Sequence, residues 1–169
     1  MNQKTIAIVV IAVVIVAVIG VAAYWMLSSG TGEPEATPTP SPGVEGASSL
    51  QFSVEITGGD SAGSYNYYAK NIGTDDMMIR VEIPAYEFTY IVNGAEQKAW
   101  SNEGSGWVDL SSTFQDQWDV WQPTYQVYAD ELVSWTSGDW TYTDGDTTVT
   151  ITDIMVNPTL EDSLFEAEA

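Results

Sequence analysis

The chain has no cysteine and no histidine among its 169 residues, and these absences exclude several kinds of chemistry. Without cysteine no disulfide forms, so a hydrophobic core has to hold the fold. Zinc, copper and haem sites lose their usual ligands, and Ser-His-Asp and Cys-His catalysis is impossible. No Gly-rich phosphate loop is present. We therefore expect no metal, no cofactor and no enzymatic activity, and carboxylates or Ser-Lys pairs are the remaining catalytic chemistry.

Positively charged residues are nearly absent as well. Four Lys and Arg stand against 24 Asp and Glu, which gives a net charge of −20. Such a field repels nucleic acid and anionic surfaces, so neither is an expected partner. Two interpretations of the charge stay open: adaptation to high salt, where screening removes the self-repulsion, or a soluble surface that gathers cations. The scarcity of lysine favours the first.

What the chain does have is an uninterrupted apolar run at its start, Thr5–Leu27, which contains no charge. A helix of this length spans about 34 Å, enough to cross a hydrocarbon core of about 30 Å. Lys4 precedes the run and no Lys or Arg follows until Lys70, so the N-terminus is expected in the cytoplasm and the rest outside the cell. The sequence predicts a single-pass membrane anchor over residues 1–27. A signal peptide cleaved after the small residues 21–23 is the alternative.

The rest of the chain divides by composition into a linker, a domain and a tail. Residues 28–49 are rich in Pro, Thr, Ser and Gly and have almost nothing to bury, which predicts an extracytoplasmic linker, either bare or O-glycosylated. Residues 50–165 are rich in aromatic side chains and are long enough to form one domain with its own core. Residues 166–169 remain as a tail.

The domain has mostly the pattern of antiparallel β-strands. Apolar alternation and turn residues predict strands over 50–56, 64–72, 77–83, 86–92, 95–101, 139–143 and 147–156. Asn93-Gly94 predicts a two-residue hairpin turn of type I′, because both of its central residues need positive φ. The apolar residues of the last strand change phase, which predicts a bulge near Asp153.

One stretch has helical periodicity instead. Its apolar side chains recur at spacings of three and four residues and form one stripe along an amphipathic helix. The stripe consists of Phe114, Trp118, Trp121, Tyr125, Tyr128, Leu132 and Trp135. Ser111 or Ser112 is the expected N-cap, and Pro123 is expected to kink or restart the helix. The predicted fold class is therefore α+β, mostly β, with one amphipathic helix on an antiparallel sheet.

This aromatic stripe has two interpretations. In the first, it packs the helix onto one face of the sheet as ordinary core. In the second, helix and sheet line a cavity for a lipid or another apolar ligand, because aromatic-lined concavities suit such ligands. All seven stripe residues are then ligand-binding candidates.

The C-terminal part of the domain is similar to a known family. Within residues 149–165 a predicted strand is followed by Asn-x-x-x-x-Asp-x-x-Phe, carried by Asn157, Asp162 and Phe165. This ending resembles that of LolA/LolB-like lipoprotein-carrier domains, and earlier segments such as Tyr-Ile-Val-Asn-Gly are similar to the hairpin strands of that family. The resemblance implies a curved, open half-barrel with the helix on its concave face and an apolar ligand between them. The layout of anchor, stalk and acidic domain is similar to that of small archaeal surface proteins.

Together these features predict a membrane-anchored, extracellular and non-enzymatic domain that binds an apolar ligand such as a lipid. Because the chain is fixed to a membrane, free shuttling of lipoproteins does not fit it. A structural or adhesive surface module that self-associates or binds other surface proteins is the first alternative. A sensor ectodomain or a small carboxylate enzyme is the second.

Overall fold

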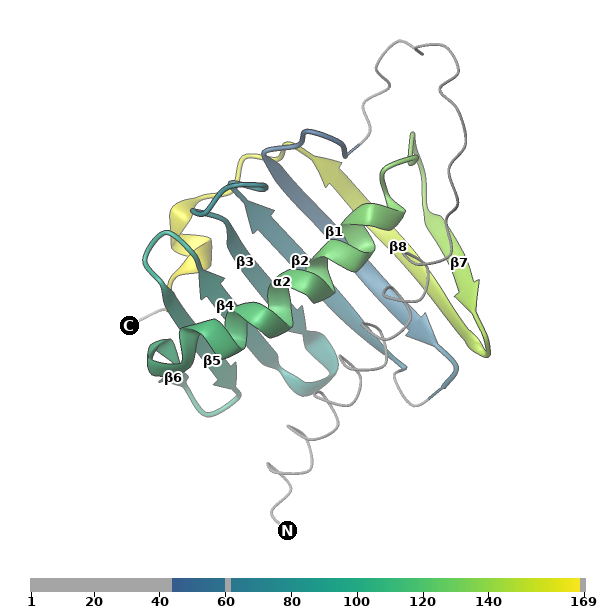
Figure 1. The fold of residues 1–169 in the computed structure, drawn as a ribbon. Coiled ribbons are helices and arrows are strands. Elements are labelled where there is room, and N and C mark those ends of the chain that lie inside the picture. Colours follow the sequence, from purple (N-terminus) through teal and green to yellow (C-terminus); the bar gives the residue numbers. More distant parts are fainter. Residues whose placement is uncertain (1–43, 60–61, 168–169) are drawn as a thin grey trace.

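The computed structural model describes residues 44–59 and 62–167, which form one antiparallel sheet crossed by one α-helix (Figure 1). The predicted anchor and the linker up to residue 43 lie outside these ranges. Within them, no helix has the length and apolar character needed to cross a membrane. The prediction of a mostly β fold, with one long helix beside an antiparallel sheet, is confirmed.

Eight strands make up the sheet within the described residues. In chain order they are β1 (Ser49–Thr57), β2 (Gly63–Lys70), β3 (Met78–Ile83), β4 (Phe88–Asn93), β5 (Lys98–Glu103), β6 (Trp107–Asp109), β7 (Trp140–Asp144) and β8 (Thr147–Val156). Their order across the sheet is β6-β5-β4-β3-β2-β1-β8-β7. The first six strands follow one another as neighbours, and β8 returns to pair with β1. The first strand of the domain therefore lies inside the sheet.

The two faces of the sheet are covered differently. Helix α2 (Phe114–Glu131) runs diagonally across one face, as Figure 1 shows. Alternate strand residues, such as Phe52 and Val54 of β1, form the core with it. The short 3-10 helix η3 (Asp162–Phe165) packs with a second, smaller cluster on the other face, over β3 and β4. Two further 3-10 helices, η1 (Pro84–Tyr86) and η2 (Ser111–Thr113), precede β4 and α2.

The bulge predicted near Asp153 is confirmed. Between Gln51 and Ser53 of β1 the pairing partner on β8 moves from Met155 to Thr152, so β8 carries one residue more than its partner at this point. Asp153 has a φ of 52°, in the left-handed region. The extra residue explains the change of phase, and both Ile151 and Ile154 pack with the helix-side core.

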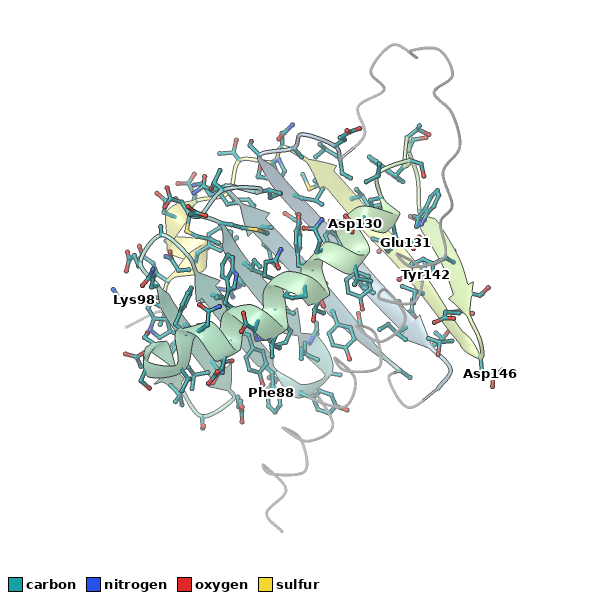
Figure 2. All side chains as sticks on the ribbon, viewed as in Figure 1. Phe88, Lys98, Asp130, Glu131, Tyr142 and Asp146 are labelled. Carbon is teal, nitrogen blue, oxygen red and sulfur yellow. The ribbon has the colours of Figure 1, made fainter. Side chains whose placement is uncertain are left out.

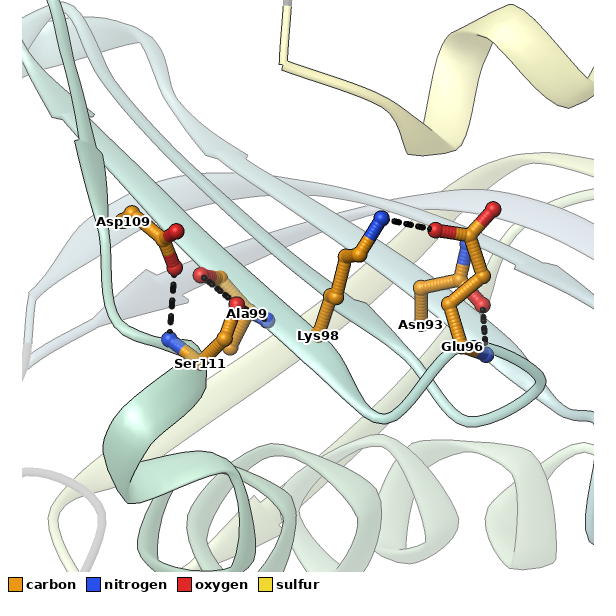
Figure 3. A network of polar contacts seen from close by, with 6 residues as sticks. All are labelled: Asn93, Glu96, Lys98, Ala99, Asp109 and Ser111. Carbon is orange, nitrogen blue, oxygen red and sulfur yellow. Dashed lines mark hydrogen bonds and ion pairs between the residues drawn. The ribbon is translucent and has the colours of Figure 1, made fainter.

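The two-residue turn predicted at Asn93-Gly94 is wrong. Asn93 is the last residue of β4 and pairs with Lys98, so residues 94–97 form the loop. The positive φ falls on Gln97, at 53°. The Asn93 Oδ1 atom accepts a hydrogen bond from the Glu96 amide at 3.1 Å and closes the loop (Figure 3). For this reason β5 begins three residues later than predicted, at Lys98 instead of Ala95.

Gly94 serves a close backbone approach. Its amide donates a 2.9 Å hydrogen bond to the Met77 carbonyl oxygen. A Cβ atom on Gly94 would lie 2.6 Å from that oxygen and 2.7 Å from the carbonyl oxygen of Asp75. Any side chain here forces two stretches of backbone apart.

We expect Gly94→Ala to lower the free energy of unfolding by about 1–3 kcal/mol, as over-packing does. The neighbouring exposed residue supplies the control, because Ala95→Ser should change the value by less than about 0.5 kcal/mol. Urea unfolding followed by tryptophan fluorescence measures both. Equal stability of the two variants would show that the loop relaxes freely.

The start of α2 also differs from the prediction. The N-cap is Thr113, which makes no side-chain capping bond, so Ser111 and Ser112 are not the cap. Ser111 instead accepts a hydrogen bond from the Ala99 amide at 3.2 Å and donates its own amide to Asp109 Oδ1 at 2.8 Å (Figure 3). The bonds from Ser111 hold the pKa of Asp109 below its usual value. Ser111 therefore connects the residues that precede α2 to β5.

Pro123 lies inside one continuous helix, so the chain does not restart there. Proline has no amide hydrogen to donate to the carbonyl of Asp119, which is on the exposed side of the helix. At the next residue, the Thr124 hydroxyl donates a hydrogen bond to the Val120 carbonyl oxygen at 2.7 Å. Water can reach the carbonyl that proline leaves free, which explains why the helix tolerates this residue.

Candidate functional site

The structure places the predicted stripe between α2 and the sheet. Its central residues Trp121, Tyr125, Tyr128 and Leu132 are each at most 3% exposed and belong to the main core. Phe114, Trp118 and Trp135 are partly buried against the same core. Because α2 ends at Glu131, Leu132 is its C-cap residue and Trp135 comes directly after the turn of residues 132–134. All seven residues line one helix–sheet interface.

Aromatic side chains of the strands meet the stripe. Phe52 lies at their centre, with its ring centroid 5.2 Å from Tyr67, 6.0 Å from Tyr125 and 6.2 Å from Tyr128. Nearer the start of the helix, Trp121 packs on Tyr90 of β4 at 4.8 Å. Offset and edge contacts of this kind stabilise by about 0.5–1.5 kcal/mol beyond burial. The middle of the interface is therefore filled by rings.

Phe114 and Trp118 pack on each other at the start of α2 with their rings tilted by 34° and the ring centroids 5.8 Å apart. The Trp118 ring also lies against the loop after β4, 3.2 Å from where a Cβ of Gly94 would be. These two stripe residues fix the first turns of the helix to the β4–β5 hairpin.

Tyr65, Tyr67, Tyr128 and Tyr142 form a group that we call the phenol cluster. Tyr67 and Tyr128 are fully buried, and their rings are 5.3 Å apart. The Tyr65 hydroxyl lies over Gly63, 3.2 Å from where its Cβ would be. The register from Gly63 through Ile56 and Val149 to Tyr142 places Tyr142 in the same row of the sheet.

The hydroxyls of the phenol cluster affect one another. Burial raises the pKa of Tyr67 and Tyr128 above the usual value. The neighbouring phenols raise the pKa of Tyr67 further, whereas for Tyr128 the charges of Tyr142 and Tyr65 raise it and a hydrogen bond with Tyr67 lowers it. Tyr65 and Tyr142 are partly exposed, so the cluster runs from the interior to the surface. Figure 2 shows Tyr142 and Glu131 near the end of α2 that lies over β7 and β8. All four phenols are uncharged at neutral pH.

Two buried donors in this region have no partner. The Tyr125 hydroxyl and the Trp140 Nε1 atom make no hydrogen bond with any residue that the structure describes. Trp140 pairs with Ile151, a core residue under the helix, so its side chain is on the helix side of the sheet. A buried donor left unpaired costs about 1–3 kcal/mol. Unpaired buried donors are rare in native proteins, and one explanation is a bound molecule that accepts their hydrogen bonds.

All three cations of the described residues lie on the other face of the sheet. Lys70 donates to the Leu160 carbonyl at 2.8 Å and pairs with Asp162, and Arg80 donates to the Leu164 carbonyl at 3.1 Å. Figure 3 shows Lys98 on the side away from α2, where Glu96 raises its pKa through a hydrogen bond and its charge. The helix side therefore carries no positive charge within the described ranges.

The three motif residues that suggested a family act together as a C-terminal clasp, residues 157–166. The Asn157 side chain accepts a 2.8 Å hydrogen bond from the Ser48 amide, Asp162 pairs with Lys70, and Phe165 is 0% exposed. These positions have a structural role on the face opposite α2. In the part of the chain that the structure describes, no group of three acidic residues is arranged to hold a metal.

Comparison with known proteins finds no family model, no curated protein and no solved structure that matches the chain. The functional assignment therefore depends on the geometry of the helix–sheet interface.

Proposed function

We propose that the chain is a membrane-anchored, extracellular and non-enzymatic domain that holds an apolar ligand between α2 and a curved, half-barrel sheet, in the manner of LolA/LolB-like domains. The observation that carries the proposal is the pair of unpartnered donors, Tyr125 Oη and Trp140 Nε1, inside an apolar aromatic interface. A ligand with an apolar body and polar atoms satisfies both donors.

The packing suggests which part of the stripe contacts this ligand. Trp121 is packed on Tyr90, and Phe114 and Trp118 pack on each other, so these three hold the helix. We place the ligand at the other end, where Tyr125 and Tyr128 pack on Phe52 of β1 and Tyr128 also packs on Tyr67 of β2. Leu132 and Trp135 belong to the same core there. Movement of the C-terminal half of α2 would open this end to the ligand, since Tyr125, Tyr128 and Leu132 are closed to solvent.

The proposed anchor is the apolar run Thr5–Leu27, which would fix the domain to the outer side of the cell membrane through the linker of residues 28–49. In this proposal the chain binds the lipid bilayer directly, through its anchor. A ligand drawn from that bilayer needs no carrier to reach the domain.

A structural surface module is the second candidate function, and one observation favours it. The aromatic rings at the centre of the interface are 4.8 to 6.2 Å apart, and the residues there are closed to solvent. Such an interior stabilises a domain without any ligand. In that case, contacts with other surface proteins or with further copies of the chain supply the function.

The test replaces one unpartnered donor. Full-length chain is extracted from its membrane in mild detergent, and bound small molecules are measured by native mass spectrometry. We expect Tyr125→Phe to retain less ligand than the parent chain. After removal of lipid with organic solvent, the variant should be as stable as the parent or more stable by about 1–3 kcal/mol, because it lacks an unpaired buried hydroxyl.

Tyr68→Phe is the matched control, because Tyr68 is on the same sheet but on the face opposite the helix, within reach of Glu82. Its ligand content should equal that of the parent. If no small molecule accompanies the parent chain, and Tyr125→Phe only adds stability, the structural-module candidate replaces the ligand proposal.

A further inference from the structure

The phenol cluster has a chemistry that selects among amphiphiles. A phenol hydroxyl both donates and accepts a hydrogen bond. The two inner residues, Tyr67 and Tyr128, are buried against the rings of the core, whereas Tyr65 and Tyr142 are partly exposed. Four such groups from β2, α2 and β7 surround one end of the interface.

The charges around the cluster are all negative. Glu131 and Asp144 lie close enough to Tyr142 to raise its pKa, after the larger effect of burial. The three cations of the described residues are on the other face, where Lys70 and Lys98 pair with Asp162 and Glu96 and Arg80 pairs with Glu82. An anionic headgroup among the phenols would be buried without a partner and next to carboxylates, which is unfavourable.

A cationic headgroup is disfavoured for a different reason. The carboxylates of Glu131 and Asp144 stand beside Tyr142, at the surface end. The inner phenols of Tyr67 and Tyr128 lie in the aromatic core and offer no negative charge. Burial of an ammonium group there without a paired carboxylate is costly.

We infer that the phenol cluster binds the headgroup of the ligand and selects amphiphiles with an uncharged, hydrogen-bonding head, such as an alcohol or an amide, over carboxylate, phosphate or ammonium heads. This inference rests on the proposed function and names the ligand class for the same interface. The apolar tail then lies along Phe52 and Leu132, and polar atoms of the head meet the Tyr125 hydroxyl and the Trp140 Nε1 atom.

Three photoreactive probes test the selection. Full-length chain in lipid nanodiscs is incubated with dodecyl diazirines that carry an alcohol, a carboxylate or a trimethylammonium head, then illuminated and digested. Mass spectrometry measures the crosslink yield on peptides of β1, β2 and α2. We expect the alcohol probe to give a yield about tenfold above either charged probe, the ratio that corresponds to one or two hydrogen bonds and a desolvation penalty.

Conservative variants connect that preference to the phenols. Tyr65→Phe and Tyr142→Phe, both at partly exposed positions, should each lower the alcohol yield about fivefold to tenfold. Tyr68→Phe, on the opposite face of the same strand as Tyr65, should leave it unchanged. Glu131→Lys should raise the carboxylate yield, because it places a cation beside the cluster.

The outcomes distinguish a failure of the ligand-binding proposal from a failure of the headgroup inference. If no probe crosslinks to β1, β2 or α2, the ligand-binding proposal itself fails. If the carboxylate or ammonium probe gives the highest yield on those peptides, the ligand site stands and the headgroup inference is overturned. An alcohol preference that persists in the Tyr65→Phe, Tyr142→Phe double variant also overturns it.

Discussion

Replacement of Trp121 by alanine is expected to remove about 3–5 kcal/mol from the free energy of unfolding, the usual effect of deleting a large buried aromatic side chain. Trp121 is 3% exposed, and its ring centroid is 4.8 Å from that of Tyr90. The helix backbone on one side and the sheet on the other prevent the space from closing. Since domains of this size are stable by only about 5–15 kcal/mol, the variant should be close to unfolding.

Urea unfolding of residues 44–169, produced alone, measures this effect. Tyr86→Ala is the control, because Tyr86 is 59% exposed in η1 and its loss should change stability by less than about 1 kcal/mol. A loss below about 2 kcal/mol for Trp121→Ala would show that this ring faces unfilled space. The ligand site would then extend to the start of the helix, as the seven-residue prediction has it.

The local pattern of the sequence predicted most strands because alternation records which face of a strand is buried. Residues 50–56 alternate without a break, and β1 places Leu50, Phe52, Val54 and Ile56 on the helix side. The change of phase in β8 likewise predicted the bulge at Asp153, since an extra residue shifts every later side chain to the other face.

Features decided by distant contacts were missed. Asn93-Gly94 has the residues of a tight turn, but Gly94 is held by the backbone of Met77, which is distant along the chain, and the loop is longer. The three-residue strand β6 follows two glycines and pairs only with β5, so it has too short an alternation to be recognised. The pairing of β8 with β1 joins the two ends of the domain, and no local signal specifies it.

Some residues of the candidate site could also be predicted from local sequence pattern, and others could not. Periodicity identified the stripe on α2, because residues three and four apart share one helix face. Which strands lie beneath it depends on the order of the sheet, so the partners Phe52, Tyr67 and Tyr90 were not identified as site residues. The same is true of Trp140, whose unpaired Nε1 atom becomes visible only when β7 is placed beside β8.

The C-terminal clasp is the part of the chain for which we expect the second large loss of stability on mutation. After β8, Asn157 takes a φ of 54°, a left-handed conformation that asparagine adopts more readily than most residues. The chain then crosses the sheet on the side away from α2, where the Ser49 hydroxyl donates to the Pro158 carbonyl at 2.7 Å. Phe165 ends the clasp in the small cluster of Met78, Ile91 and Leu160.

Phe165→Ala is therefore expected to lower the free energy of unfolding by about 3–5 kcal/mol, although the residue lies near the chain end. Phe165 covers β3 and β4, and without its ring Met78 and Ile91 lose their cover on that face. Ser163→Ala, at an exposed position of the same 3-10 helix, should change stability by less than about 0.5 kcal/mol. Urea unfolding and amide hydrogen exchange in β3 and β4 measure both variants. If Phe165→Ala leaves stability and exchange like those of Ser163→Ala, the clasp is a loose appendage, and the core under α2 alone holds the domain together.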